Sequence, residues 1–252
     1  MCGRYAFLTP ADIFDAVFNI TADPPFPLRS NIAPTQSAPV IRTNPDSGRR
    51  EALLMRWGLI PHWAKDPKIG QKMFNARVET AAEKPSFRTA WKSRRALIPA
   101  SAFYEWKKEG TKKTPYSINL PNHQPFALAG LWSTWQPPEI PPPEDGKSEG
   151  GNPVKQNHDS GLFDDADEVS TAENKPENKI IQSFTILTTI PQGIIQKLHH
   201  RMPVILSPDQ YDQWLAPRKL NDDEVPLLIA NTLANQLTAH PTPEIFKQRT
   251  PP

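Results

Sequence analysis

Hydrophobic residues along the chain come in short runs that turn residues separate. The clearest runs cover residues 53–60, 96–98, 116–120, 126–132, 183–189 and 204–206. Many short strands favour an antiparallel or barrel-like sheet. Helix starts are few: Thr9 and Ser207 each precede a proline and an early acidic residue, the pattern of a helix N-terminus, and residues 225–237 are expected to form a further helix. The pattern predicts one α+β domain, a barrel-like mixed or antiparallel sheet flanked by a few helices.

Residues 137–179 break this pattern, because they are rich in proline, glycine and acidic residues, with 11 acidic against 4 basic side chains. Such a segment buries too little apolar surface to offset its ordering entropy. We therefore expect a disordered surface insertion between two strands of a domain that spans residues 2–238. The insertion is either an inert loop or an acidic competitor for a polyanionic ligand. A proline-rich tail over residues 239–252 is expected to be flexible.

Charge and composition narrow the function classes. The net charge of +2 divides into −7 on residues 137–179 and +9 on the rest, which suits a phosphate-bearing ligand. No apolar run reaches the ~18 residues of a membrane span, and no secretory signal pattern opens the chain, so we expect an intracellular protein, in the cytoplasm or in a nucleus, with no membrane partner. One cysteine and no HExxH motif give no basis for a disulfide, a metal site or a cofactor.

The single cysteine is the second residue. Initiator methionine is commonly removed before a small residue, which would leave Cys2 with a free α-amine, of pKa ~7.7–8.0, beside its thiol. An aldehyde can form a Schiff base with that amine, and the thiol can then close a thiazolidine ring. The alternative interpretation is a small buried hydrophobic residue.

Two further segments carry candidate acid–base groups. Glu105 lies between large aromatic residues in the segment 103–106, where burial would raise its pKa and suit proton transfer; the alternative is a surface acid on a strand. His199 and His200 are adjacent, and histidine shuttles protons near pH 7. Neighbours in an extended chain point to opposite sides, so one of the two is expected to be structural.

Seven segments, in order, resemble the SOS response-associated peptidase (SRAP) family of abasic-site processing proteins over roughly residues 2–216. They begin at Cys2 (CGR), Asn31 (NIAP), Trp57 (WGLIP), Asn75 (NARVET), Phe103 (FYEW), Ala129 (AGLW) and His199 (HHRMP). The resemblance implies a barrel-like core with a positively charged groove. It also implies that single-stranded DNA is the partner, and that a processed Cys2 captures the ring-opened sugar of an abasic site as a thiazolidine DNA–protein crosslink.

The same resemblance implies the roles of individual residues. We also expect the protein to be a monomer. The catalytic set would be Cys2 as nucleophile, Glu105 as acid and base, His199 for opening the sugar ring, and Asn75 for orienting the N-terminus. The DNA contacts would come from Arg4, Asn31, Pro34, Trp63, Arg77 and Thr188. The family's peptidase name would correspond to removal of Met1, because no Ser/His/Asp spacing supports general proteolysis.

Two other classes remain as alternatives. Glutamine amidotransferases with an N-terminal nucleophile also begin Met-Cys-Gly, but the chain lacks the Asn-Gly-Glu segment that such enzymes use. A passive single-stranded DNA-binding module would bind equally well without Cys2 and would form no covalent product.

Overall fold

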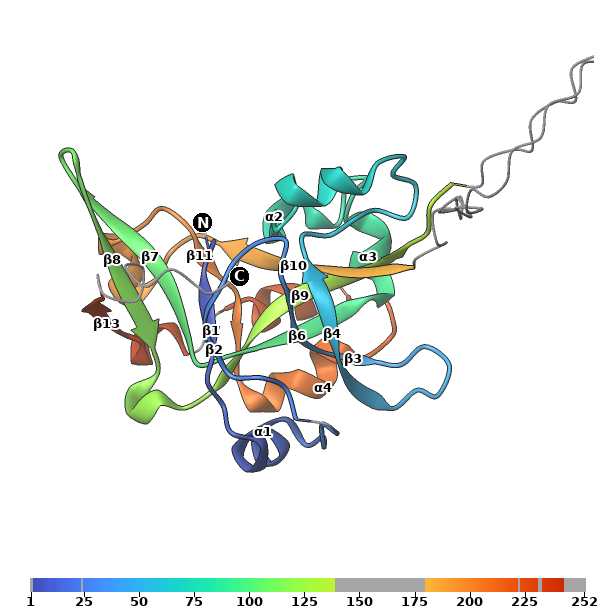
Figure 1. Ribbon diagram of the computed structural model, residues 1–252, viewed down its shortest axis with the longest axis horizontal. Coiled ribbons are helices and arrows are strands. Elements are labelled where there is room, and N and C mark those ends of the chain that lie inside the picture. The colour runs from blue at the N-terminus through green and yellow to red at the C-terminus, as the bar shows by residue number, and fades with distance from the viewer. Residues whose placement is uncertain (1, 24, 139–179, 222, 231–232, 243–252) are drawn as a thin grey trace, which may run out of the picture.

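A closed barrel of five strands forms the centre of the molecule (Figure 1). The computed structural model describes residues 2–23, 25–138, 180–221, 223–230 and 233–242. The barrel strands are β3 (Ser37–Thr43), β4 (Arg50–Trp57), β6 (Arg95–Ala100), β9 (Phe126–Trp135) and β10 (Ile181–Thr189). Strand β10 pairs with both β4 and β9 and so closes the ring, and its pairing with β4 is the parallel one. The predicted α+β class and mixed barrel-like core are confirmed.

Close packing at two seams explains why the barrel closes. Where β4 meets β10, the rings of Trp57 and Phe184 are stacked, with centroids 6.2 Å apart and planes 6° apart. Where β9 passes between β6 and β10, Gly130 lets the backbones approach, since a Cβ there would lie 3.0 Å from the Thr185 carbonyl oxygen. Buried aromatic contacts and a missing side chain thus allow neighbouring strands to pack closely at both seams.

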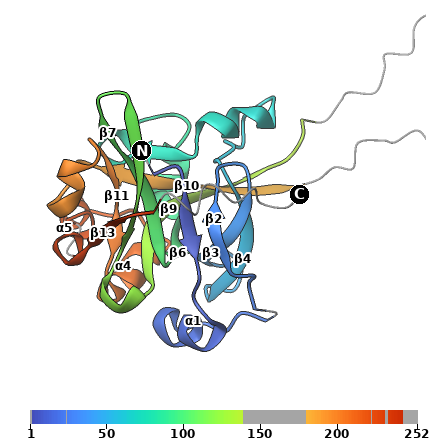
Figure 2. The ribbon, with the colours of Figure 1, turned by 60° about the vertical axis from the view of Figure 1, so that its left-hand side comes forward.

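A second sheet of five strands lies against the barrel and carries the N-terminal strand in its interior. Its order is β13 (Thr238–Pro241), β8 (Lys112–Asn119), β7 (Ala102–Glu109), β1 (Tyr5–Phe7) and β2 (Arg29–Ile32). The N-terminal end of β1 therefore lies beside β7 (Figure 2). Three short strands complete the structure: β5 (Asn75–Arg77) and β11 (Met202–Pro203) pair with β10, and β12 (Ile205–Leu206) pairs with β9.

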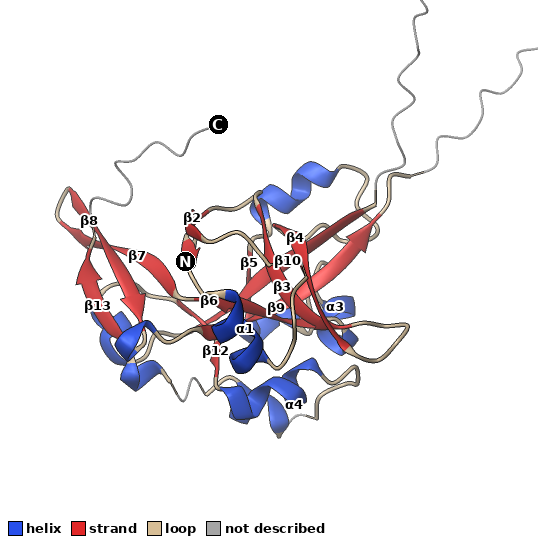
Figure 3. Cartoon of the chain, turned by 60° about the horizontal axis from the view of Figure 1, so that its bottom comes forward, coloured by secondary structure: helices blue, strands red, loops and turns tan. Residues whose placement is uncertain are grey.

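Short helices lie around the strands (Figure 3). The α-helices are α1 (Ala11–Phe18), α2 (Val78–Ala81), α3 (Arg88–Ser93), α4 (Tyr211–Leu215) and α5 (Glu224–Leu228). The 3₁₀ turns are η1 (Pro67–Lys72), η2 (Pro121–His123), η3 (Gly193–Lys197), η4 (Pro208–Gln210) and η5 (Ala234–Gln236). Within the described ranges, no helix is long and apolar enough to cross a membrane.

Three local predictions need correction. The helix expected over residues 225–237 is wrong: α5 ends at Leu228, and η5 is a separate turn that leads into the extended Leu237. The flexible tail expected from residue 239 is wrong over its first residues, because β13 takes the open hydrogen-bonding edge of β8 and pairs Ala239 with Ile118. Thr9 does not cap α1; its hydroxyl is instead hydrogen-bonded to that of Ser101, 3.2 Å away.

Two further expectations concern the helix start at Ser207 and the acidic segment. Ser207 does precede a helical turn as expected: it forms a capping box with Gln210 at the start of η4. Strands β9 and β10 flank the acidic segment and pair with each other through Trp135 and Ile181, so that segment leaves and rejoins the barrel at neighbouring points. Residues 139–179 and 243–252 lie outside the described residues, and so do the expectations of disorder made for them.

Candidate active site

Strand β1 places Cys2 inside the protein. The strand is held on one side by β7, where the Tyr104 N–H donates to the Arg4 carbonyl oxygen at 2.9 Å, and on the other side by β2. Cys2 is fully buried, and its Sγ lies 4.0 Å from the Arg4 carbonyl oxygen. The pKa of the thiol is raised well above its usual range, chiefly by burial and next by the negative charge of Glu105. The thiol is therefore protonated until a neighbouring group accepts its proton.

Asn75 connects Cys2 to the barrel. Its Nδ2 donates to the Cys2 carbonyl oxygen at 2.7 Å, and β5, which carries it, pairs with β10. Among the described residues, nothing donates a hydrogen bond to the buried Asn75 Oδ1. A buried amide oxygen normally has a partner. The side chain therefore holds the backbone of Cys2 with one end and offers an acceptor to a ligand with the other.

Glu105 is buried, with 2% of its surface exposed, so the surface-acid alternative is wrong. It lies on β7, the neighbour of β1, and burial raises its pKa to about 7. Because its charge contributes to the raised pKa of Cys2, the carboxylate and the thiol interact electrostatically. A carboxyl group with this pKa can both accept and donate a proton near neutral pH.

His199 comes from the turn that follows η3. Its N–H donates to the Ile195 carbonyl oxygen at 2.9 Å, and its Nδ1 lies 3.1 Å from the N–H nitrogen and 3.2 Å from the carbonyl oxygen of Arg201. These backbone contacts fix the orientation of the ring. The pKa of His199 is lowered, mainly by burial, which favours the neutral imidazole.

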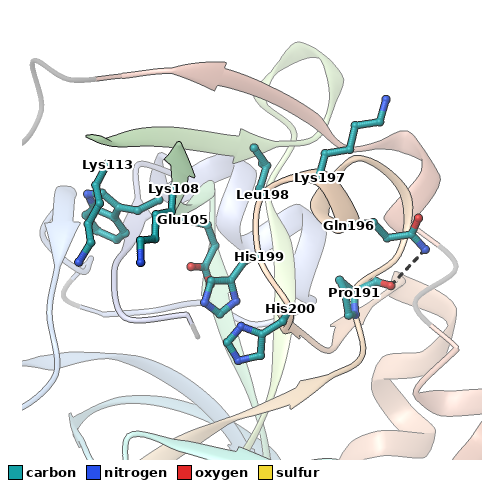
Figure 4. A pocket seen from close by; sticks show the side chains of 10 residues that line it. Glu105, Lys108, Lys113, Pro191, Gln196, Lys197, Leu198, His199 and His200 are labelled. Carbon is teal, nitrogen blue, oxygen red and sulfur yellow. Dashed lines mark hydrogen bonds between the residues drawn. The ribbon is translucent and has the colours of Figure 1, made fainter. Parts of the chain in front are cut away.

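One open pocket, with a volume of about 760 Å³, joins Glu105 to both histidines (Figure 4). The rings of His199 and His200 have centroids 4.2 Å apart. The expectation that one of the pair is structural assumed an extended strand. The chain turns here instead, and both rings line the pocket. Among the described residues, no three His, Cys, Asp or Glu side chains are grouped so that they could hold a metal ion.

The residues expected to contact DNA differ in exposure. Arg4 Nη1 donates to Asn31 Oδ1 at 3.2 Å, and both side chains are half-buried. Pro34 is half-buried, Arg77 is exposed and Trp63 is 50% exposed; these three are accessible to a ligand.

Thr188 is not accessible in this way. It is only 1% exposed, and its hydroxyl donates to the Ala76 carbonyl oxygen at 3.3 Å. The Thr188 side chain is therefore buried and not open to a ligand in this structure, contrary to the expectation that it contacts DNA.

An ion pair that the sequence analysis missed joins two of the seven segments. Arg201 donates two hydrogen bonds to the carboxylate of Glu79, both at 2.8 Å, and another to the Thr188 carbonyl oxygen at 2.5 Å. The side-chain hydrogen bonding from Arg201 lowers the pKa of Glu79. The pair fixes the turn that holds His199 against the segment that holds Asn75. Its two residues are 122 positions apart, and opposite charges in two motifs are the only sequence signal for it.

Sequence comparison finds relatives along the whole chain. Residues 1–247 match the family model described as SOS response associated peptidase (SRAP). The abasic site processing protein YoqW of Bacillus subtilis is 36% identical over 244 residues, covering 95% of this chain and 91% of that protein. The abasic site processing protein YedK of Escherichia coli is 28% identical over 249 residues, covering 96% and 91%.

Structural comparison agrees with the sequence. A protein from Bacteroides thetaiotaomicron aligns with a TM-score of 0.74 at 22% identity, covering 99% of this chain and 95% of its own. A protein from Bordetella bronchiseptica aligns with a TM-score of 0.70 at 24% identity, covering 96% and 99%. At such identities these two structures establish the shared fold alone, whereas the family model and the Bacillus relative establish the family. The chain belongs to the SOS response associated peptidase (SRAP) family.

Proposed function

We propose that this protein captures abasic sites in single-stranded DNA by forming a covalent bond through Cys2. The observation that carries the proposal is the burial of Cys2, which directly precedes β1, together with Glu105 on the adjacent strand β7, while Asn75 donates a hydrogen bond to the Cys2 carbonyl oxygen. The names of the relatives, abasic site processing proteins, support the same lesion as the target.

The chemistry begins with removal of Met1, which frees the α-amine of Cys2. An abasic sugar is a cyclic hemiacetal in equilibrium with an open aldehyde. Opening the ring requires loss of the proton on the C1′ hydroxyl and a proton at the ring oxygen. A neutral imidazole such as that of His199 accepts the first proton, and its protonated form then supplies the second.

Ring closure follows in two balanced steps. The amine adds to the aldehyde carbon and one water leaves, which gives a Schiff base. The thiol sulfur then bonds to the same carbon, and the thiol proton ends on the nitrogen, so the thiazolidine forms without an oxidant or a reductant. Because the pKa of the Cys2 thiol is raised and that of Glu105 is about 7, the carboxylate is suited to carry this proton from sulfur to nitrogen.

A denaturing gel tests the proposal. Wild-type protein, mixed with a single-stranded oligonucleotide that carries one abasic site, is expected to give a band of lower mobility that survives denaturation. The same oligonucleotide with an intact base is the control and is expected to give none. A complex that binds the abasic oligonucleotide in native gels but disappears entirely on denaturation would identify a passive binding module instead.

A further inference from the structure

The hairpin of β7 and β8 distributes its charges unequally between its two faces. In the antiparallel register, Lys108 lies directly opposite Lys113, and Glu109 lies directly opposite Lys112. Directly opposed residues share a face of the sheet, and neighbours in a strand point to opposite faces. One face therefore carries two ammonium groups side by side, and the other carries a carboxylate among lysines.

The mixed face is electrostatically satisfied within the hairpin. Lys107 Nζ lies 2.6 Å from Glu109 Oε1, and this contact raises the pKa of Lys107 and lowers that of Glu109. Lys112 also lowers the pKa of Glu109. No ligand is needed to balance the charges on this face.

The lysine face is different, because like charges directly opposite each other destabilise a strand pair. Within the described ranges, neither Lys108 nor Lys113 forms an ion pair with a carboxylate. Both side chains line the pocket that contains Glu105 and His199. Figure 4 shows the two lysine side chains on the same side of the pocket, whereas the side chain of Lys197 extends away from them.

We propose that Lys108 and Lys113 together bind one phosphate of the DNA strand next to the captured sugar. An anion between the two ammonium groups replaces their repulsion with two attractive contacts, and a phosphodiester oxygen accepts charge-assisted hydrogen bonds from both. The same pocket is lined by Glu105 and His199, so a phosphate held by the two lysines would lie close to the groups assigned to the reaction. The inference rests on the proposed function, since it assigns part of the substrate to part of the same pocket.

The test uses a single-stranded oligonucleotide with one tetrahydrofuran residue, an abasic analogue that has no aldehyde and so reports binding alone. Dissociation constants are measured at several salt concentrations for the wild type, for K108A/K113A, and for the matched control K107A/K112A, which removes the same charge from the other face. We expect K108A/K113A to bind about tenfold more weakly at low salt, with a salt slope smaller by about 0.7, the value for one phosphate of a single strand. The control is expected to change the affinity less than twofold, because its charges lie outside the pocket and are screened.

A second measurement locates the phosphate. Methylphosphonates, which lack the negative charge, replace the phosphates of the analogue one at a time. For the wild type, a methylphosphonate at one position next to the analogue is expected to weaken binding. For K108A/K113A, the same replacement is expected to cause no further loss of affinity. Equal losses for the two double variants, or an equal methylphosphonate profile for the wild type and K108A/K113A, would overturn the inference.

These outcomes are separable from those of the proposed function. If the wild type binds the analogue but never crosslinks a true abasic site, the covalent function fails while the lysine pair is still judged by its own variants. If the wild type crosslinks but the two double variants behave alike, the function stands and the lysine pair is only a solvated surface.

Discussion

The site has an inner and an outer region, and the two are built on opposite physical principles. The inner region, Cys2, Asn75 and Glu105, is held by strands β1, β5 and β7, with Cys2 and Glu105 almost without solvent. The outer region is exposed to water: Trp63 lies on a loop, Arg77 at the end of β5, and Lys108 and Lys113 on the β7–β8 hairpin. Desolvation gives the inner groups unusual pKa values, whereas the outer charges keep their hydration and interact weakly until a ligand brings a phosphate.

The comparison predicts that inner substitutions change the rate of capture and that outer substitutions change affinity and its salt dependence. The largest effect is expected for Cys2→Ala, which removes the sulfur of the thiazolidine. No stable crosslink should form on a denaturing gel, while the tetrahydrofuran oligonucleotide should bind with wild-type affinity. A crosslink of normal yield in this variant would place the nucleophile elsewhere.

Glu105→Gln and His199→Ala are expected to slow capture by about 10²–10⁴-fold each, the usual contribution of a positioned acid or base. Single-turnover rates at saturating oligonucleotide measure this loss, and analogue binding serves as the control. Because the pKa of Glu105 is about 7, the wild-type rate should also change with pH around that value, and this inflection should be absent in Glu105→Gln. Weaker binding with an unchanged capture rate would contradict both assigned roles.

Glu105→Gln also separates stability from activity. A carboxyl group whose pKa is raised in the folded state binds more protons there than in the unfolded chain, so its ionisation costs stability as pH rises from about 4.3 to about 7. The variant should therefore be more stable than the wild type above pH 7, by up to about 3 kcal/mol, and equally stable near pH 4. Denaturant unfolding at the two pH values measures the difference; a variant less stable at pH 8 would show that the charge is stabilised by its neighbours.

Asn75→Ala is expected to slow capture by about tenfold, because it removes one hydrogen bond to the Cys2 carbonyl group. Analogue binding should fall less than the rate does, since the residue positions the nucleophile more than it holds the strand. Loss of affinity equal to the loss of rate would instead make Asn75 a binding residue.

The smallest effect is expected for an outer residue, Arg77→Ala. It should weaken analogue binding a few-fold and reduce the salt slope by about 0.7, as the loss of one phosphate contact does on single strands. The capture rate at saturating DNA measures whether the residue acts beyond binding. An unchanged salt slope would remove Arg77 from the DNA interface.

The sequence predicted the class of fold better than the extent of its elements. Runs of apolar residues marked parts of β4, β6, β8, β9, β10 and β12. They did not mark β3 and β7, because Pro39 interrupts β3 and charged residues end β7. Residues 239–241 were misjudged as well, since β13 depends on the open edge of β8 and not on its own composition.

The same difference holds for the site: local motifs predicted some of its residues, whereas contacts between distant segments could not be predicted. Cys2, Asn75, Glu105 and His199 stood out because their local segments resemble a family. The Arg201–Glu79 ion pair, the burial of Thr188 and the Lys108–Lys113 pair depend on strand register and on contacts between distant segments, which no local pattern contains. The sequence analysis assumed an extended chain at the two histidines, whereas the chain turns there and both rings line the pocket.

Intact-protein mass spectrometry, before and after exposure to an abasic oligonucleotide, tests the central claim most directly. The account predicts a protein that lacks Met1 and then gains the mass of the oligonucleotide less one water, with the attachment mapped to the N-terminal residue. A chain that keeps Met1 and still crosslinks normally would contradict it.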